Sequence, residues 1–193
     1  MVFRSFDGRT DRPYLEGDLP CPLNVYGASK AEAEREVCAV MPGALVIRTS
    51  AFFGPWDDAN MPSALFRSLN RGARYLAPSD TVVSPTYVPH LVHATLDLLI
   101  DGEGGVWHLA NEGVVSWYEF ACTLATRSGR RLDHIAPCDG AQLWGPVRRP
   151  FYSALASRRG TILPPLDDAV NEFLRDAGHL QGNEQAVTCA ASA

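Results

Sequence analysis

Short apolar runs alternate with amphipathic segments along most of the chain, and the period of each segment predicts its structure. Apolar or alternating runs indicate strands, whereas apolar residues that recur every three to four positions indicate helices. The predicted strands or extended segments are 44–50, 81–88, 105–111 and 132–138. The predicted helices are 24–41, 62–72, 89–102, 117–129 and 167–180.

The order of these segments predicts an α/β fold, because strands that alternate with helices form a parallel sheet. The helix from 117 has a start signal in Ser116 and Glu119, which have capping-box spacing. Residues 7–23 are rich in Gly, Pro and Asp and are expected to form a loop. We expect one domain over 1–180, and a disordered tail over 181–193. Sheets of this kind carry their chemistry at the carboxyl ends of the strands, and the loop after 44–50 is such a place.

Composition and charge narrow the classes of function. The length of 193 residues suits one domain, and a net charge of -5 without a basic block argues against nucleic-acid binding. No stretch approaches the roughly 20 apolar residues of a membrane span, and no signal peptide is visible. Five cysteines without a CxxC pair predict reduced thiols in a cytoplasmic protein, and no metal site is expected.

The segment NVYGASKAEAE contains the candidate chemistry. Lys30 is the single lysine in a chain with sixteen arginines, and it follows Tyr26 by four residues. On a helix these side chains share a face, about 5–6 Å apart at Cβ. An ammonium beside a phenol stabilises the phenolate, so Tyr26 becomes a candidate general acid for carbonyl reduction. The alternative is a partly buried tyrosine beside a solvated lysine, which spacing alone favours.

Seven sequence blocks occur in a fixed order, and together they resemble the dTDP-4-dehydrorhamnose reductase family of extended short-chain dehydrogenases/reductases. The blocks are FDG (6–8), RPYLEGD (12–18), PLNVYGASKAEAE (22–34), LVIRTSAFFG (45–54), SPTYV (84–88), WHLANEGVVSWYEFA (107–121) and RPFYSAL (149–155). The resemblance implies a partial Rossmann-like parallel sheet with a small C-terminal substrate lobe. It implies reduction of a 4-keto nucleotide sugar by NADPH or NADH, and nothing in the sequence decides between these two cofactors.

The resemblance also implies roles for individual residues. Tyr26 would protonate the C4 carbonyl oxygen, and Lys30 would hold the nicotinamide ribose and tune Tyr26. Residues of the loop after 44–50 would border the nicotinamide, namely Thr49, Ser50, Ala51 and Phe52. Substrate contacts would come from Ser84, Thr86, Tyr87 and Arg149. Arg149 is equally well explained as a surface arginine before a proline, whereas Trp107, Trp117 and Phe120 are expected in the core.

The sequence departs from the family in three ways. It has no Gly-rich phosphate loop, and the family's catalytic Ser or Thr has no counterpart. Ala51 stands at a tryptophan position, and Tyr152 stands where the family often has Asn. The chain therefore resembles the C-terminal portion of such a reductase. We expect it to bind NADPH poorly by itself, and to form a homodimer or pair with a complementing N-terminal chain.

Two other functions remain open from the sequence. The family resemblance extends to the regulatory beta subunit of methionine adenosyltransferase, which keeps the fold while serving as a partner. The chain could accordingly be a non-catalytic subunit that binds a nucleotide sugar or regulates a partner. An inactive fragment is the third interpretation.

Overall fold

The computed structural model describes residues 5–179, which form α/β structure as predicted. The helices are α1 (Val25–Val40), α2 (Met61–Asn70), α3 (Val88–Ile100), α4 (Trp117–Arg127), α5 (Gly140–Trp144) and α6 (Leu166–Asp176). The strands are β1 (Leu45–Arg48), β2 (Phe52–Phe53), β3 (Tyr75–Pro78), β4 (Val82–Val83), β5 (Thr86–Tyr87), β6 (Gly105–His108), β7 (Val115–Ser116) and β8 (Ile135–Cys138). The tail predicted at 181–193 lies outside the described residues.

The strands associate in pairs, and most of the pairs are parallel. Strand β1 pairs with β6, β2 with β5, and β3 with β8, all in parallel, whereas β4 and β7 are antiparallel. The parallel prediction is therefore confirmed. The sequence pattern did not reveal β2, β3, β7 or α5. Strands β2 and β7 have two residues each and α5 has five, within loops rich in polar or turn residues, so they show no period, and β3 ends in a proline.

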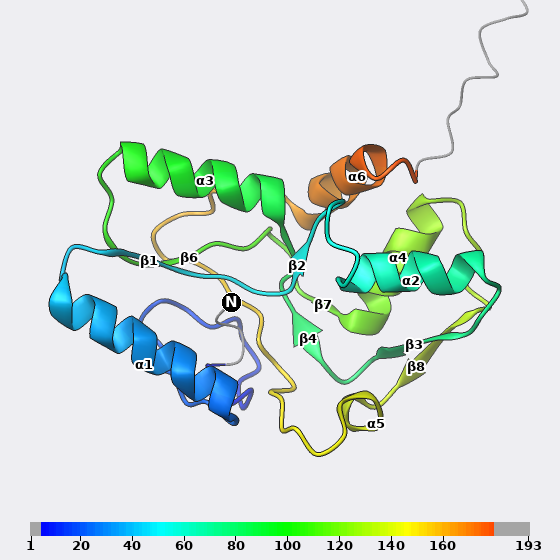
Figure 1. Cartoon of the computed structure of the whole chain (residues 1–193), viewed down its shortest axis with the longest axis horizontal. Coiled ribbons are helices and arrows are strands. Elements are labelled where there is room, and N and C mark those ends of the chain that lie inside the picture. The colour runs from blue at the N-terminus through cyan, green and yellow to red at the C-terminus, as the bar shows by residue number, and fades with distance from the viewer. Residues whose placement is uncertain (1–4, 180–193) are drawn as a thin grey trace, which may run out of the picture.

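Figure 1 shows two regions side by side. In one region, α1 and α3 lie on opposite sides of the β1–β6 pair. In the other, α2, α4 and α6 gather on one side of the β3–β8 pair, and α5 lies on the other side. The short strands β2, β4 and β7 lie near the centre of the molecule, between the two regions, and β5 pairs with β2 there.

Each region has its own hydrophobic cluster, and the two clusters differ in size. The cluster around β3–β8 contains four buried phenylalanine side chains, those of Phe53, Phe66, Phe120 and Phe173. The cluster between β1–β6 and α3 is built from Ala94, Leu98, Trp107, Leu109 and Leu163. Trp107 and Phe120 are buried, and Trp117 packs against the larger cluster, so the expectation that these aromatic residues are core is confirmed.

The start of α4 confirms the capping box. Ser116 Oγ accepts a hydrogen bond from the Glu119 amide (3.1 Å), and Glu119 Oε2 accepts one from the Ser116 amide (2.7 Å). Both bonds satisfy amide groups that a helix start leaves without intrahelical partners. The preceding strand β7 therefore passes into α4 with a fixed geometry.

The loop before α1 is fastened to the segment 150–157. The Tyr14 amide donates to the Ala154 carbonyl (2.9 Å), and the Tyr14 carbonyl accepts from the Ala156 amide (2.9 Å). Phe6 stacks on Tyr14 with ring centroids 4.0 Å apart. The loop predicted at 7–23 is thus an ordered support for the rest of the fold.

Residues 5–179 contain neither a membrane-spanning helix nor a cluster of metal-ligating side chains. No helix in this range is long and apolar enough to cross a membrane. The same range contains no group of three or more His, Cys, Asp or Glu side chains arranged to hold a metal ion.

Candidate functional site

Asn24 fixes the start of α1 relative to the segment that carries Arg149. Its side-chain oxygen accepts from the Gly27 amide (2.9 Å) and caps the helix, as expected for Asn at this position. Its side-chain nitrogen donates to the Arg148 carbonyl (2.9 Å). One side chain therefore brings the predicted catalytic helix next to the predicted substrate segment.

Tyr26 and Lys30 lie side by side on the first two turns of α1. The Lys30 ammonium is 5.6 Å from the centroid of the Tyr26 ring. Both side chains are accessible, with 38% of Tyr26 exposed. The placement is the one that the spacing predicts, and it leaves the phenol within reach of a ligand.

The residues after β1 form a buried corner. Thr49, Ser50 and Ala51 are almost completely buried, and Phe52 is half-buried. The Thr49 hydroxyl donates to the Thr86 hydroxyl (3.3 Å), so the predicted cofactor and substrate segments meet here. Ser50 Oγ is buried and has no hydrogen-bond partner among the described residues. A buried hydroxyl without a partner is costly, and it marks a place where a ligand group can supply the bond.

The backbone at this corner is strained. Ala51 has φ = 44°, the one non-glycine residue with positive φ between 5 and 179. A side chain costs roughly 1–2 kcal/mol in this conformation, so the surroundings must enforce it. The Ala51 carbonyl accepts from the Thr86 amide (3.1 Å), which holds the turn against β5. Strain of this kind is often found at ligand-binding sites.

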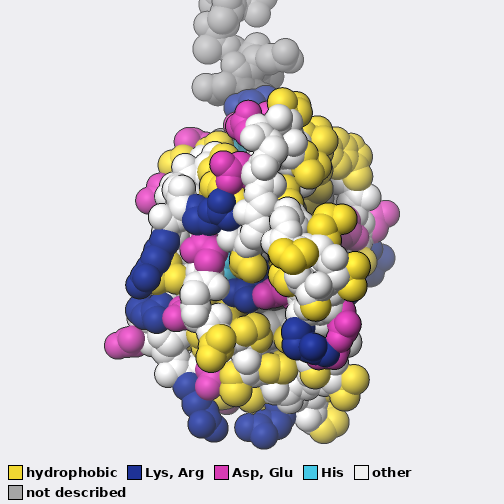
Figure 2. All heavy atoms as spheres, turned by 90° about the vertical axis from the view of Figure 1, so that its left-hand side faces the viewer, with side chains coloured by type: hydrophobic (Ala, Val, Ile, Leu, Met, Phe, Trp, Pro, Cys, Tyr) yellow, Lys and Arg dark blue, Asp and Glu magenta, His cyan; other side chains and the backbone are white. Residues whose placement is uncertain are grey.

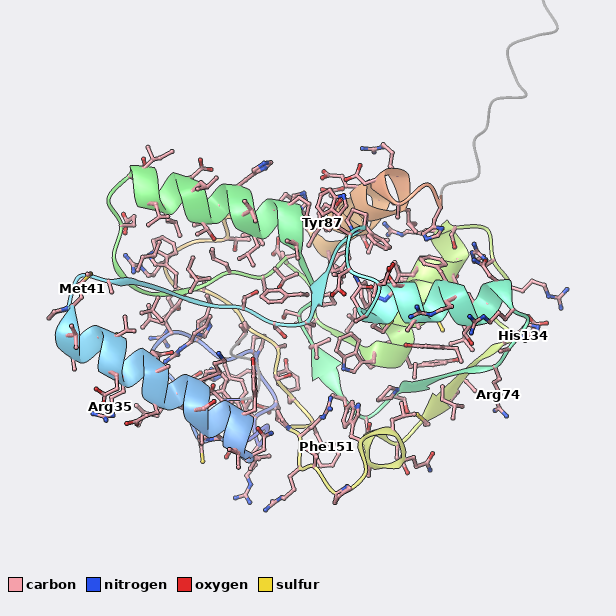
Figure 3. The ribbon with its side chains drawn as sticks, in the orientation of Figure 1. Arg35, Met41, Arg74, Tyr87, His134 and Phe151 are labelled. Atoms are coloured by element: carbon pink, nitrogen blue, oxygen red, sulfur yellow. The ribbon has the colours of Figure 1, made fainter. Side chains whose placement is uncertain are left out.

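Three of the predicted substrate contacts, Ser84, Thr86 and Tyr87, are completely buried. Ser84 Oγ accepts from the Leu155 amide (3.1 Å), and Thr86 Oγ1 donates to the Ser84 carbonyl (3.4 Å). The Tyr87 hydroxyl donates to Asp176 on α6 (2.5 Å). Burial and this bond to a carboxylate raise the pKa of Tyr87 well above its ordinary value. These side chains are engaged in the interior, and Figure 3 shows Tyr87 beside α6.

A cavity of about 320 Å³ opens between β3, α2 and the segment before Phe151. Its lining is mostly apolar, with polar groups from Asn60, Tyr75, Thr81, Trp117, Trp144 and Arg149. A second cavity of about 480 Å³ adjoins it and shares Trp144 and Arg149. The second cavity is further lined by Asp7, Gly8, Arg9, Leu23, Ala141, Gly145, Pro146, Val147, Arg148 and Phe151.

Arg149 lies half-buried on the border between the two cavities. Its guanidinium lies 4.7 Å from the centroid of the Trp144 ring. Arg148 beside it is exposed, and its carbonyl holds Asn24. A guanidinium fork in this position is suited to a phosphate or diphosphate group.

Gly8 allows the FDG loop to pack against the backbone of the segment that carries Arg149. It has φ = 74°, and an added Cβ would lie 2.8 Å from the Phe151 amide nitrogen. The Gly8 amide donates to the Tyr14 hydroxyl, which in turn donates to Asp7, both at 2.9 Å. The FDG and RPY blocks therefore form one support for the second cavity.

Sequence reasoning missed Asn60, Tyr75 and Trp144 as lining residues. Asn60 caps α2 and donates to the Gly54 carbonyl (2.8 Å), and its position just before a predicted helix was a usable signal. Tyr75 and Trp144 lie in β3 and α5, which the pattern did not predict, so nothing in the sequence pointed to them. Burial raises the pKa of Tyr75 to about 12, so its phenol stays protonated at neutral pH.

Comparison with known proteins identifies the family of the chain. The RmlD substrate binding domain family matches residues 3–177. A dTDP-4-dehydrorhamnose reductase of Mycolicibacterium smegmatis is 34% identical over 179 residues, which are 91% of this chain and 54% of that protein. Methionine adenosyltransferase 2 subunit beta of Danio rerio is 30% identical, over 94% of this chain and 60% of that protein. The chain thus spans little more than half the length of these relatives.

Solved structures show the same fold. A dTDP-4-dehydrorhamnose reductase of Bacillus anthracis in complex with NADP superposes with a TM-score of 0.84 at 25% identity, over 90% of this chain and 63% of that one. A dTDP-glucose 4,6-dehydratase of the same organism, in complex with NAD, gives a TM-score of 0.75 at 17% identity, which shows the fold alone. The match over residues 3–177 is the decisive finding, and the chain belongs to the RmlD substrate binding domain family.

Proposed function

We propose that this chain takes part in the NAD(P)H-dependent reduction of a 4-keto nucleotide sugar, of the dTDP-4-dehydrorhamnose type. The observation that carries the proposal is the Tyr26–Lys30 pair, accessible at the start of a helix that Asn24 joins to the Arg149 segment. The reductase relatives support the same reaction class.

In this proposal Tyr26 is the general acid. Its hydroxyl donates a proton to the C4 oxygen of the sugar as the carbonyl becomes an alcohol. Lys30 stabilises the phenolate left behind and holds ribose hydroxyls with its three N–H donors. A bound NADPH or NADH would supply the hydride.

The described residues fit the nicotinamide end of such a cofactor. The buried Ser50 hydroxyl lacks a partner, and a polar ligand group at the strand end would supply one. Thr49, Ala51 and Phe52 shape the same corner, and Tyr26 and Lys30 face it in our proposal. The sequence contains no Gly-rich loop to hold the pyrophosphate, so we expect NADPH binding by this chain alone to be weak.

The two adjoining cavities fit the nucleotide part of the substrate. The apolar cavity suits a base and its sugar, and Arg149 at the border suits the diphosphate. Ser84, Thr86 and Tyr87 are buried, so we propose that they shape the floor beneath the hexose rather than extend side chains to it.

We further propose that the outer surfaces of α1 and α3 contact another polypeptide. Val40, Met41, Leu99 and Ile100 are 56–84% exposed, and Figure 2 shows hydrophobic side chains at the surface on this end of the molecule. The occupant is a second copy, or a chain that supplies the phosphate loop. Gel filtration of the purified chain is expected to show a dimer, or a monomer that forms a complex with such a chain. A compact monomer that remains stable and associates with neither would contradict this proposal.

We propose that the protein is located in the cytoplasm, because the cysteines that the structure describes are free thiols. None of the four cysteines between residues 5 and 179 forms a disulfide, which fits a reducing compartment such as the cytoplasm. Fractionation of cells that express the tagged chain tests this proposal. Recovery outside the cytoplasm would contradict it.

A non-catalytic role is the second candidate. The similarity to methionine adenosyltransferase 2 subunit beta, at 30% identity over 94% of this chain, supports this candidate. An inactive fragment is the third candidate.

The experiment is to mix the chain with NADPH and dTDP-4-dehydrorhamnose and to follow NADPH absorbance, while a separate titration measures sugar-nucleotide binding. Catalysed loss of absorbance supports the reductase. Binding without turnover favours the non-catalytic subunit, and absence of both points to the inactive fragment. The last two results contradict the reductase proposal for this chain.

A further inference from the structure

The inward face of α1 has little that can fix the rotation of the helix. Its inward positions are Gly27, which is buried, and the half-buried residues Ala31, Glu34 and Cys38. Three of these side chains are small or absent, so they give little of the interdigitation that normally sets a helix in register. Glu34 is the one long side chain on this face.

Glu34 reaches from α1 to the end of β1. Its two carboxylate oxygens accept from Arg48, with Oε2 2.9 Å from Nε and Oε1 2.5 Å from Nη2. The side chains are nearly buried, with 13% of Glu34 and 4% of Arg48 exposed. Two parallel bonds of this kind define the relative orientation of the two groups.

Further contacts hold Arg48 itself in place. Its Nη1 donates to the Glu16 carbonyl (3.2 Å) and lies 3.3 Å from His108 Nε2. The guanidinium carbon also lies 5.6 Å from the centroid of the Phe6 ring. Arg48 is therefore a fixed point on the sheet, and Glu34 connects α1 to it.

The ion pair joins the two halves of the proposed site. Glu34 follows Lys30 by four residues and Tyr26 by eight, so all three lie near one side of α1. Arg48 directly precedes Thr49 and Ser50 at the buried corner. A rotation of α1 about its axis would move Tyr26 and Lys30 relative to that corner, and the Glu34–Arg48 bonds oppose such a rotation.

We propose that Glu34 and Arg48 are positioning residues, which set the direction in which Tyr26 and Lys30 point. This inference rests on the proposed function, since it concerns the placement of the proposed catalytic pair. Neither residue has to touch the substrate or the cofactor in this role.

The test compares Glu34→Gln with Glu32→Gln. Glu32 is also ion-paired on α1, to Arg35 at 2.5 Å, but both side chains are about 60% exposed, and Figure 3 shows Arg35 projecting from the outer side of the helix. Glu34→Gln keeps the shape and removes the charge. We expect amide hydrogen exchange in α1 to become at least roughly 10-fold faster, because a buried arginine loses its partner. Exchange in α4 and α6 should stay unchanged, and Glu32→Gln should affect neither.

Kinetics provide the second measurement. Misplacement of the acid by about 1 Å can lower kcat by about 100-fold, whereas KM for the nucleotide sugar should change little because its cavities lie elsewhere. Glu34→Asp keeps the carboxylate and should recover part of kcat. If Glu34→Gln fails to fold, the double variant Glu34→Leu with Arg48→Met replaces the pair by apolar groups of similar size. It should fold, yet still show low kcat and fast exchange in α1.

The outcomes separate this inference from the proposed function. Fast exchange confined to α1 supports the inference even if the wild-type chain reduces no sugar. Equal acceleration in α1, α4 and α6 would show a general loss of stability and overturn it. Exchange like that of Glu32→Gln would also overturn it, as would wild-type kcat in the folded double variant.

Discussion

The regions around β3–β8 and β1–β6 are stabilised in different ways. The first surrounds four buried phenylalanine rings with α2, α4 and α6. The second has a cluster of five buried residues, and it exposes apolar side chains on both of its helices. The helix that carries Tyr26 and Lys30 buries only Gly27 and is held mainly through Asn24 and Glu34.

The larger hydrophobic core and the proposed catalytic pair therefore lie in different regions of the molecule. The region with the large core forms the wall of the apolar cavity, and packed aromatic side chains hold it together. The region with the small core carries the proposed acid, and polar contacts rather than packing determine its geometry. Variants in the two regions should therefore fail in different ways.

The largest expected effect is loss of the aromatic core. Phe173 is 1% exposed, and its ring lies 5.5 Å from that of Phe53. Phe173→Ala should lower the free energy of unfolding by about 3–5 kcal/mol, through lost burial and the cavity left behind. Leu98→Ala, in the smaller cluster, should cost less, near the lower end of about 2–5 kcal/mol.

Urea unfolding of both variants measures this difference. Leu19→Ala is the control, because Leu19 is 86% exposed in the loop before α1 and should have almost no effect. A larger loss for Leu98→Ala than for Phe173→Ala would reverse the comparison between the two regions.

A smaller effect is expected from pH, and it arises in the region with the small core. Burial lowers the pKa of His108, Glu16 nearby opposes this shift, and the Arg48 charge adds to it. His108 Nδ1 lies 3.0 Å from the carbonyls of Tyr14 and Ala156, and Nε2 faces Arg48. A neutral His108 ring with its proton on Nδ1 can donate to these carbonyls and accept from Arg48 at Nε2.

The direction of the pH effect follows from this lowered pKa. The unfolded chain takes up the proton first, so the contribution of His108 is complete above about pH 6.5 and is lost as pH falls towards the folded pKa. The loss is about 1.4 kcal/mol for each unit between the two pKa values. Urea unfolding at several pH values measures it, with His108→Gln expected to flatten the curve.

His179 provides the comparison in the other region, because burial and then Arg130 lower its pKa as well. His179→Gln should remove a separate part of the pH dependence. If His108→Gln left the whole dependence in place, the assignment to the β1–β6 region would be wrong.

Much of the fold could be read from the sequence, for physical reasons. Helices α3, α4 and α6 have a sustained apolar period, and α4 also has the start signal of the Ser116–Glu119 box. Helix α1 was predicted from its content of Ala and Glu, which favour helices. Strands β2, β3 and β7 could not be predicted, because they depend on pairing with residues far away in the chain, and α5 is too short to show a period. Strand β3, for example, exists through its pairing with β8.

The site was predictable in part for the same reason. Tyr26 and Lys30 need only helix spacing to lie side by side. The contact of Thr49 with Thr86 accompanies the pairing of β2 with β5, and the sequence pattern did not reveal β2. The ion pair between Glu34 and Arg48 joins α1 to β1, and no local sequence pattern predicts it, because the two residues are 14 positions apart. Tyr75 and Trp144, which line the apolar cavity, could not be predicted, because they lie in β3 and α5, which the sequence pattern did not reveal.

The most direct test of the account is the effect of Tyr26→Phe on reduction and on binding, measured in the same preparation. The variant keeps the ring and removes the proton donor, so kcat should fall by about 10²- to 10⁴-fold while the Kd for the nucleotide sugar stays essentially unchanged. Tyr118→Phe, on α4, is the matched control and should leave both values as they are. A Tyr26→Phe variant that retains kcat, or that loses binding as much as turnover, would contradict the role of Tyr26 as the general acid.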